Sequence, residues 1–332
     1  MEERFRDTDS RRDMLKAFAG ALPALYLSAA SAQTAANGSK TEFVICDSYL
    51  TWTTPEAAVE LASAAGFDGV VWGIRPSSMI EVENAEKKLP RMMELSRKAG
   101  MSTPHIAADI LDANSARADG VLGAIRDVGV KVYRSRFFRY DFQKDLNLQL
   151  DSFKRQIAGL SKLNEKYGLR AAIHTQSGPL NMGGAMWDLW IALKELDPAY
   201  IGIDLDIGHV ALQGGPSWQQ STRFAAKYLA TAAVKDFVWS REARSAGRSE
   251  WVAKWVPPGE GMVDFKAFFQ CLRQVNFTGA IEEHFEYSVQ VGDKQVNLLR
   301  LKGGDISRAQ WLAEAKRDVS YFRAAMRDAK LL

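Results

Sequence analysis

Beyond about residue 40, short β-type runs alternate with amphipathic helical stretches, and the chain contains eight such strand–helix pairs. This alternation is typical of a parallel sheet whose strands are connected by helices. The runs predicted to be strands are residues 43–49, 69–74, 101–110, 130–136, 169–175, 200–207, 232–237 and 279–286. Eight units are the number that closes into a (β/α)8 barrel, the TIM-barrel fold of the α/β class. The sequence therefore predicts one barrel domain over residues 41–330.

An open doubly wound sheet is the alternative architecture. It usually has fewer units and carries a glycine-rich phosphate-binding loop after its first strand. Here residues 47–52, Asp-Ser-Tyr-Leu-Thr-Trp, occupy that place, and no long Gly/Ser linker divides the chain into two domains. We therefore expect a barrel, with its catalytic groups at the carboxyl ends of the strands.

The first 32 residues have the features of an export signal. Two adjacent arginines, 11–12, precede a weakly apolar run, 17–30, and residues 30–32 match the small-x-small pattern that signal peptidases cleave. The run is too short and too rich in small residues to span a bilayer. The pattern resembles a twin-arginine signal, and an ordinary amphipathic helix is the other interpretation. We expect residues 1–32 to be a signal peptide, 33–40 to be a linker, and the mature protein to be periplasmic or otherwise exported.

Composition limits the classes of partner. The formal net charge of +3 includes arginines of the predicted signal, and the chain has no basic stripe or polybasic tail. Nothing therefore indicates nucleic acid or a membrane surface as a partner, and no later segment reads as a membrane span. The two cysteines, Cys46 and Cys271, lie in apolar segments, which indicates buried free thiols. The sequence leaves the oligomeric state open, including a homo-oligomer.

All four histidines of the chain lie at or just past predicted strand ends. They belong to the third, fifth, sixth and eighth strands and are His105, His174, His209 and His284. A single histidine is more often a packed or a surface residue than a ligand. Four histidines at one rim of a barrel instead indicate an active site, because catalytic groups come from that rim.

Side-chain alternation places acidic groups inside the barrel. In the eighth strand Glu282, His284 and Glu286 share one face, which suits the barrel interior, whereas Glu283 falls on the otherwise apolar outer face. In the sixth strand Asp204 and Asp206 point inward by the same rule.

Buried carboxylates need neighbouring cations or hydrogen-bond donors. The candidate cations are Lys235 on the seventh strand and Arg134 and Arg136 on the fourth. An internal ion-pair network of the kind that fills many barrels is the alternative to a functional role, and it applies more to Asp204 than to Asp206.

Three short segments carry a resemblance to a known family. Residues 206–209, Asp-Ile-Gly-His, are similar to the Asp-x-x-His on the sixth strand of the xylose-isomerase-like sugar phosphate isomerase/epimerase family. Residues 233–236, Ala-Val-Lys-Asp, resemble its seventh-strand His-x-Lys-Asp, and residues 259–265 resemble its Gly-Glu-Gly-x-x-Asp-Phe. The resemblance extends over about residues 41–325 and is closer to a secreted branch that carries a twin-arginine signal.

The resemblance implies a divalent metal that grips adjacent oxygens of a sugar, while a pair of ligating carboxylates moves a proton beside a carbonyl. The family's four ligand positions read His174, Asp206, Ala233 and His284 in this chain, so only the aspartate is retained. Two histidines and one carboxylate are still a known transition-metal arrangement, and His209 is a further candidate ligand. We expect His174, Asp206, His209 and His284 to bind Mn, Fe, Co or Zn in preference to Mg.

With this resemblance, roles can be predicted for the polar residues of the site. The predicted catalytic residues, among which the base is expected, are His174, Glu282, His284 and Glu286. The predicted substrate-binding residues are His105, Arg134, His209, Lys235 and Glu260. The alternative is a metal-free site in which histidines, Lys235 and arginines hold a sugar or an acid. Residues 239–258 form a long connection and are expected to be a loop of the kind that often makes a lid.

Three functions follow as hypotheses. The first is an exported isomerase, epimerase or related lyase that acts on a sugar or keto-sugar by proton transfer beside a carbonyl. The second is a barrel that has lost catalysis and binds a carbohydrate, which the changed ligand set favours. The third, an endonuclease of the same superfold, would need a multi-metal site and a basic DNA track that the sequence does not offer.

Overall fold

A computed structural model describes residues 41–243 and 248–332 of the chain. The predicted signal peptide, 1–32, and the predicted linker, 33–40, lie outside the described residues. The described residues form one compact unit.

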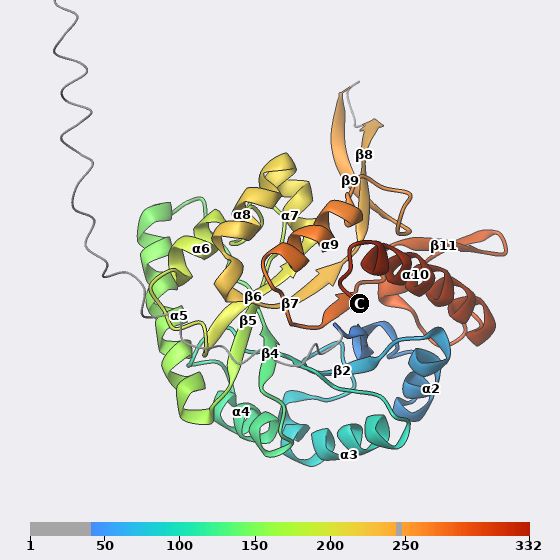
Figure 1. Ribbon diagram of the computed structural model, residues 1–332, viewed down its shortest axis with the longest axis horizontal. Helices are drawn as coiled ribbons and strands as arrows, with labels where there is room; N and C mark the ends of the chain where they lie inside the picture. Colours follow the sequence, from blue (N-terminus) through green and yellow to red (C-terminus); the bar gives the residue numbers. More distant parts are fainter. Residues whose placement is uncertain (1–40, 244–247) are drawn as a thin grey trace, which may run out of the picture. The chain divides into compact units, whose positions relative to one another are not determined.

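Eight parallel strands close into a barrel at the centre of this unit (Figure 1). Their order around the barrel is β1-β10-β7-β6-β5-β4-β3-β2. They are β1 Phe43–Cys46, β2 Gly69–Ile74, β3 Ile106–Ala108, β4 Val132–Ser135, β5 Arg170–His174, β6 Ile201–Asp206, β7 Leu229–Val234 and β10 Ile281–Glu283. The predicted single-domain TIM barrel is confirmed.

Helices surround the barrel and cover its outer face (Figure 1). They are α2 Pro55–Ala65, α3 Ala85–Lys98, α4 Ala118–Asp127, α5 Leu146–Tyr167, α6 Trp187–Leu193, α7 Ile207–Gly214, α8 Trp218–Phe224, α9 Phe265–Gln274 and α10 Arg308–Asp328. Short 3-10 helices connect them: η1 Asp47–Tyr49, η2 Val82–Asn84, η3 Gly215–Ser217, η4 Ala226–Tyr228 and η6 Leu298–Arg300. Local sequence sets their ends. Thr54 caps α2 ahead of Pro55, and Gly66 ends α2 with a φ of 98°.

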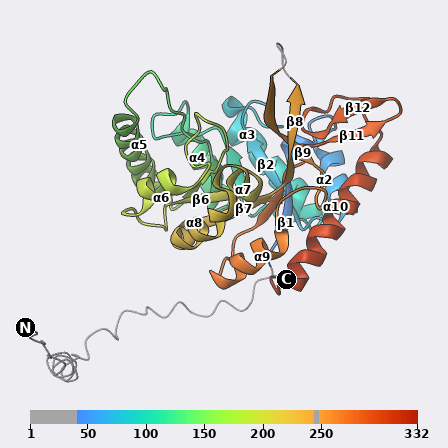
Figure 2. The same ribbon diagram turned by 90° about the horizontal axis from the view of Figure 1, so that it is seen from above.

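The expectation that residues 239–258 form a loop is wrong. The chain leaves the barrel after β7 and forms an antiparallel hairpin of β8, Asp236–Ala243, and β9, Ser249–Val256. Figures 1 and 2 show this hairpin projecting beyond the helices. Alternating aromatic side chains explain it, because Phe237 and Trp255 are register partners on one face. A second hairpin, β11 Ser288–Val291 with β12 Lys294–Asn297, follows β10 and was not expected from the sequence.

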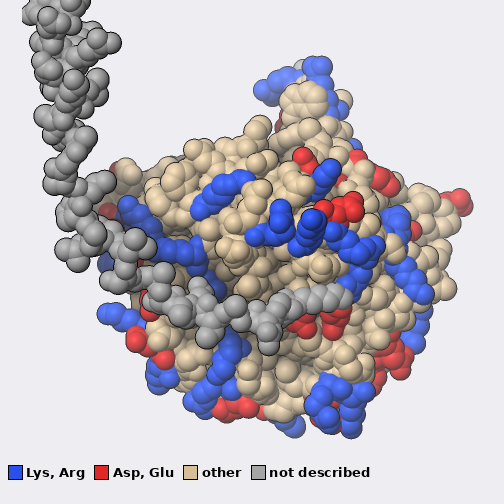
Figure 3. Space-filling model, in the orientation of Figure 1, with Lys and Arg blue, Asp and Glu red and all other residues tan. Residues whose placement is uncertain are grey.

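The surface gives two observations on partners. None of the described helices is both long and apolar enough to cross a membrane. On the face drawn in Figure 3, basic and acidic side chains are interspersed over the outer elements, without a continuous basic track on the visible part.

Glu283 is the one acid of β10 that faces outward, between the barrel and α10. Its side chain is buried, and its carboxyl group lies against that of Asp318. Burial, together with the neighbouring Asp318, holds the pKa of Glu283 well above its usual range. Asp318 accepts a hydrogen bond from Tyr287 and pairs with Arg317, and burial raises its pKa too. The raised pKa favours the protonated form of Glu283 in the folded protein.

This buried carboxyl should make stability depend on pH. A group whose pKa is raised on folding stabilises fully below its unfolded pKa, and that contribution is lost as the pH rises. We expect the free energy of unfolding to fall by up to about 1.4 kcal/mol per pH unit above the usual range of glutamate. In urea unfolding between about pH 5 and 8, Glu283→Gln should reduce this dependence of the unfolding free energy on pH. The control Glu165→Gln, on the exposed side of α5, should leave the dependence unchanged. A slope that persists in Glu283→Gln would contradict the assignment.

Candidate active site

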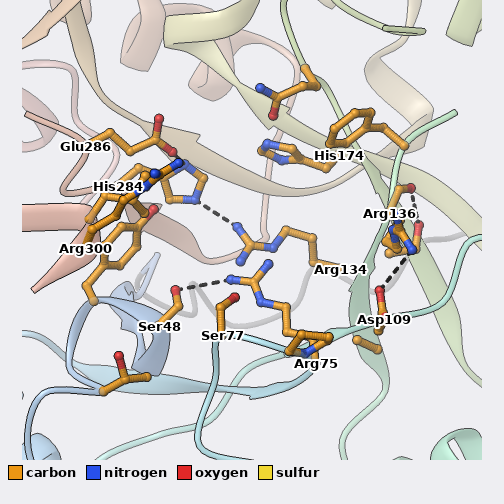
Figure 4. A pocket seen from close by; sticks show the side chains of 18 of the residues that line it. Ser48, Arg75, Ser77, Asp109, Arg134, Arg136, His174, His284, Glu286 and Arg300 are labelled. Carbon is orange, nitrogen blue, oxygen red and sulfur yellow. Dashed lines mark hydrogen bonds and ion pairs between the residues drawn. The ribbon is translucent and has the colours of Figure 1, made fainter. Parts of the chain in front are cut away.

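Four polar side chains meet where separate barrel strands end. His174 is the last residue of β5 and Asp206 the last of β6, while Lys235 directly follows β7 and His284 directly follows β10. Parallel strands of a closed barrel end at the same rim, so residues far apart in sequence converge there. Figure 4 shows His174 and His284 facing one cavity together with Arg134.

The His174 ring is held by its neighbour on β6. Its Nδ1–H donates to Asp204 Oδ2 at 2.7 Å, and Thr231 donates to the other oxygen of Asp204, also at 2.7 Å. Burial lowers the pKa of His174 more than Asp204 raises it, so the imidazole is neutral near neutral pH. Its Nε2 carries a lone pair, makes no hydrogen bond with a described residue and is available at the cavity. Asp204 therefore orients His174.

His209 is fixed in the same tautomer by different partners. Its Nδ1 lies 2.8 Å from Ser177 Oγ, and its Nε2 accepts from the Lys235 ammonium at 2.7 Å. Burial, and then the charge of Lys235, hold the pKa of His209 well below its usual range. His209 is thus a neutral imidazole whose Nε2 lone pair points toward Lys235. Gly208 permits this approach, because a Cβ there would lie 2.5 Å from Lys235 Cγ.

Asp206 joins these groups through one carboxylate. Its Oδ2 accepts from His284 Nδ1 at 2.9 Å and lies 3.2 Å from Lys235 Nζ. Its Oδ1 accepts the backbone N–H of His209 at 3.2 Å and so caps α7. Burial opposes the charge on Asp206, but Lys235, His209 and His284 outweigh burial and hold its pKa well below the usual range. Asp206 is therefore ionised at every physiological pH.

Glu282 lies beneath the rim and holds His284 from the other side. Its carboxylate, 1% exposed, contacts Arg134 at 3.1 Å, His284 Nε2 at 3.1 Å and His105 Nε2 at 3.2 Å. Burial lowers the pKa of His284, but hydrogen bonds to Asp206 and Glu282 outweigh burial and raise it to about 9. The raised pKa favours the imidazolium form of His284, and Glu282 and Arg134 position its Nε2.

Glu286 completes the site from the chain that leaves β10. Its Oε2 lies 2.8 Å from Lys235 Nζ, and its Oε1 lies 3.8 Å from His284 Nδ1. Burial would raise the pKa of Glu286, but Lys235 and His284 lower it overall. Lys235 also lies 4.3 Å from the centre of the Trp255 ring, a cation–π contact that buries its ammonium. Glu286 is the ionised carboxylate that borders the cavity beside His284.

The cavity has a volume of about 690 Å³. Arg134, His174, His284 and Glu286 line one part of it, and Arg75 lines another (Figure 4). A volume of this size suits a small ligand of the dimensions of a sugar. The cavity therefore brings a neutral imidazole, an imidazolium and a carboxylate to one small molecule.

Among the described residues, His174, Asp206 and His209 form the one group able to hold a metal ion. Each offers a ligand atom, and these atoms lie within 4.8 Å of one another. The donor chemistry fits, because both imidazoles are neutral, and Asp204 and Ser177 occupy the Nδ1 atoms and leave the Nε2 lone pairs for a metal. The Lys235 ammonium now contacts two of the three ligands, so a bound ion would share or replace those contacts. His284 lies outside the group, since both its nitrogens contact other side chains.

Of the five predicted substrate-binding residues only Arg134 lines the cavity. Lys235 contacts the lining residue Glu286 and His209 packs beside His174, whereas His105 and Glu260 lie elsewhere. His105 was expected past the end of the third strand, but it precedes β3, is fully buried and contacts Glu282. Glu260 is exposed and does not line the cavity. Its Gly-Glu-Gly segment instead wraps Asp236, whose carboxylate accepts the N–H groups of Gly259 and Gly261 at 3.0 Å. The motif therefore shapes the chain after β9, and the expected positions of both residues are wrong.

Sequence reasoning missed several residues of the site. Arg75 follows β2 directly and lines the cavity, so the strand-end rule could have found it. Ser177 lies three residues past the end of β5 and could have been found in the same way. Trp255 arrives from the β8–β9 hairpin, and no sequence signal connects it with Lys235. Arg136, a candidate cation for the inner aspartates, instead pairs with Asp109 at 3.3 Å at the exposed rim.

Comparison with known proteins agrees with this architecture. The family model described as "Xylose isomerase-like TIM barrel" matches residues 59–302, and the chain belongs to this family. A search of the curated proteins found no match to the chain. Among solved structures it is similar to 3-keto-D-glucoside 4-epimerase from E. coli, with a TM-score of 0.60 and 14% identity over 86% of this chain and 100% of that one.

Two other solved structures show the same fold. D-psicose 3-epimerase from Clostridium cellulolyticum H10, solved with D-tagatose, has a TM-score of 0.61 and 13% identity over 86% of this chain and 99% of that chain. The IolI protein, solved with a zinc atom, has a TM-score of 0.59 and 15% identity over 85% and 97% of the two chains. At such low sequence identities, the similarity to these structures shows the fold alone.

The buried charges of the site should show in stability. Arg134→Met would leave Glu282 ionised and without its arginine in the barrel interior, which should cost roughly 3–5 kcal/mol of unfolding free energy. The double variant Arg134→Met, Glu282→Met removes both charges and should recover part of this loss in urea unfolding. Equal losses in the single and the double variant would show that Arg134 stabilises by packing alone.

Proposed function

We propose that this protein is an isomerase or epimerase that moves a proton beside the carbonyl of a sugar or keto-sugar. The observation that carries the proposal is the convergence of His174, His284 and Glu286 on one cavity of sugar size. The ring centres of His174 and His284 lie 5.7 Å apart, so both can reach the same small molecule. Structural neighbours that are epimerases of sugars support the same class of reaction.

Two groups would serve the proton transfer, one as the base and one by stabilising negative charge on the oxygen. Glu286 is ionised, borders the cavity and is oriented by Lys235, which suits it to remove the proton from the carbon acid. Both ring nitrogens of His284 are engaged by Asp206 and Glu282, so its positive charge, rather than a free N–H, would stabilise the developing oxyanion. Arg134, buried beside His284, adds positive charge on the side where the oxyanion would form.

His174, Asp206 and His209 would hold a divalent metal in this proposal. Such an ion polarises a carbonyl and stabilises negative charge on its oxygen. Asp204 and Ser177 keep the two imidazoles in the tautomer that ligation needs. Mn, Fe, Co and Zn suit this donor set better than Mg. In the absence of an ion, the free Nε2 of His174 would make that residue a second candidate base.

We further propose that the protein works outside the cytoplasm. The support is the sequence of residues 1–32, in which twin arginines, an apolar run and a small-x-small triplet follow in order. The proposal rests on that sequence alone.

Deuterium exchange tests the proton transfer. In D2O the wild-type protein should incorporate deuterium beside the carbonyl of at least one keto-sugar, measured by NMR on a panel that includes D-fructose and D-tagatose. Glu286→Gln should slow incorporation by about 100-fold or more, because a general base contributes on that order. Glu165→Gln on exposed α5 is the matched control and should exchange like wild type.

Two outcomes would count against this assignment. Unchanged exchange in Glu286→Gln would remove that residue from the role of base. Binding of keto-sugars without any exchange would favour the second hypothesis, a barrel that binds carbohydrate without converting it.

Metal content tests the ligand set independently of activity. Protein purified without chelator should contain close to one equivalent of Mn, Fe, Co or Zn by elemental analysis. His174→Ala and His209→Ala should lose it, and Asp204→Asn should weaken binding by about 10–100-fold, because it orients a ligand. Asp109→Asn, which alters a cavity carboxylate outside the group, should keep the metal. Full occupancy in both histidine variants would overturn the ligand assignment.

A further inference from the structure

The cavity has an excess of positive charge that the proton-transfer groups do not use. Five of its lining residues are basic, and they are Arg75, Arg134, Arg136, Arg300 and Lys302. Two are acidic, Asp109 and Glu286. A neutral sugar is bound by hydroxyl and amide groups and does not call for a net charge in its pocket.

The two cavity carboxylates are already neutralised by neighbours. Asp109 pairs with Arg136 at 3.3 Å, and Glu286 pairs with Lys235 at 2.8 Å. Arg134 is likewise matched, by Glu282 at 3.1 Å. The positive charge of Arg75, Arg300 and Lys302 is left over. None of these three side chains makes an ion pair with any residue in 41–243 or 248–332.

Neutral hydrogen-bond partners hold the Arg75 side chain at the wall of the cavity. Its Nε donates to Ser78 Oγ at 3.2 Å and one terminal nitrogen donates to Ser48 Oγ at 3.1 Å and to Cys46 Sγ at 3.7 Å. These contacts fix a half-buried guanidinium at the cavity, and the buried Asp47 carboxylate interacts with its charge without forming an ion pair. Figure 4 shows the Ser48 contact and places Arg75 on the other side of Arg134 from His174. A fixed guanidinium presents paired donors that match carboxylate and phosphate oxygens.

The unpaired cations and His174 come from different parts of the barrel. Arg75 follows β2, and Arg300 and Lys302 come from η6 and the residues after it, whereas His174 ends β5. β2 and β5 are separated by β3 and β4 around the barrel. One ligand that spans the cavity would therefore place one end at the basic residues and extend past Glu286 and His284 toward His174.

We propose that the substrate is an anionic sugar whose carboxylate or phosphate is held by Arg75, Arg300 and Lys302. The inference rests on the proposed function, since it names the substrate class of that same site. The charged group anchors the molecule at one end and presents its carbonyl end to Glu286 and His284. Uncompensated cations in a concave site also attract anions from solution, which favours capture of such a substrate.

Equilibrium binding of three matched hexoses tests the proposal. D-glucuronate, D-glucose 6-phosphate and D-glucose differ in carrying a carboxylate, a phosphate or neither group. By calorimetry at low salt, at least one anionic probe should bind about tenfold more tightly than glucose, and added NaCl should reduce the difference. The tighter of the two anions identifies whether a carboxylate or a phosphate is recognised.

Variants at the exposed cations make the test specific. Arg300→Gln combined with Lys302→Gln should lose most of the preference for the anionic probe, and thermal unfolding checks that the fold is retained. Lys294→Gln, on exposed β12 outside the cavity lining, should keep the preference. Equal affinity for all three hexoses, no binding of either anion at millimolar concentration, or an unchanged preference in the double variant would overturn the proposal.

The two proposals fail in distinguishable ways. Deuterium exchange into a neutral keto-sugar without any anionic preference would overturn the anionic substrate and leave the isomerase intact. Anionic preference that depends on Arg300 and Lys302, in a protein that exchanges no substrate proton, would support the binding site and count against the isomerase.

Discussion

The carboxylate of Asp206 contacts side chains and backbone from several elements at the mouth of this barrel. It is fully buried, accepts from His284, contacts Lys235 and caps α7 through the N–H of His209. A buried charge is tolerated only when its lone pairs and its counter-charge are supplied in good geometry. Elements that come from β6, β7, β10 and α7 are therefore oriented around one side chain. The positions of His284, Lys235 and Glu286 follow from that requirement.

The same requirement explains how this chain departs from the ligand pattern of its family. The seventh-strand position where the resemblance implies a histidine is Ala233, which pairs in register with Asp206 on one side and Glu282 on the other. Two residues later Lys235 brings its ammonium to Asp206, His209 and Glu286. A cation from the protein thus lies beside the carboxylate and the imidazole that would also serve a metal. In the proposed function, proton transfer rests on Glu286 and His284 rather than on two ligating glutamates.

How far the sequence could predict the site depended on the range of the interaction. Asp206 and His284 were predicted from strand alternation, because a period of two assigns each residue to a face without knowledge of any neighbour. His105 was misplaced, since one histidine in a ten-residue apolar run does not show where the short β3 begins. Glu260 was predicted to bind substrate because its motif is recognisable, but the glycines of that motif, not its acid, make the contact with Asp236.

By itself the sequence determined the barrel, the inward-facing acids and the rim on which chemistry takes place. These follow from local periodicity and from the rule that parallel strands end together. Only the tertiary structure decided which acid meets which cation, which tautomer each histidine takes, that the long connection is a hairpin, and that three basic residues face the cavity unpaired. Those properties depend on distances between residues far apart in the sequence, such as Arg75 and Arg300, which are 225 positions apart. The closed barrel determines which charges pair at such separations, and no local pattern in the sequence predicts these pairs.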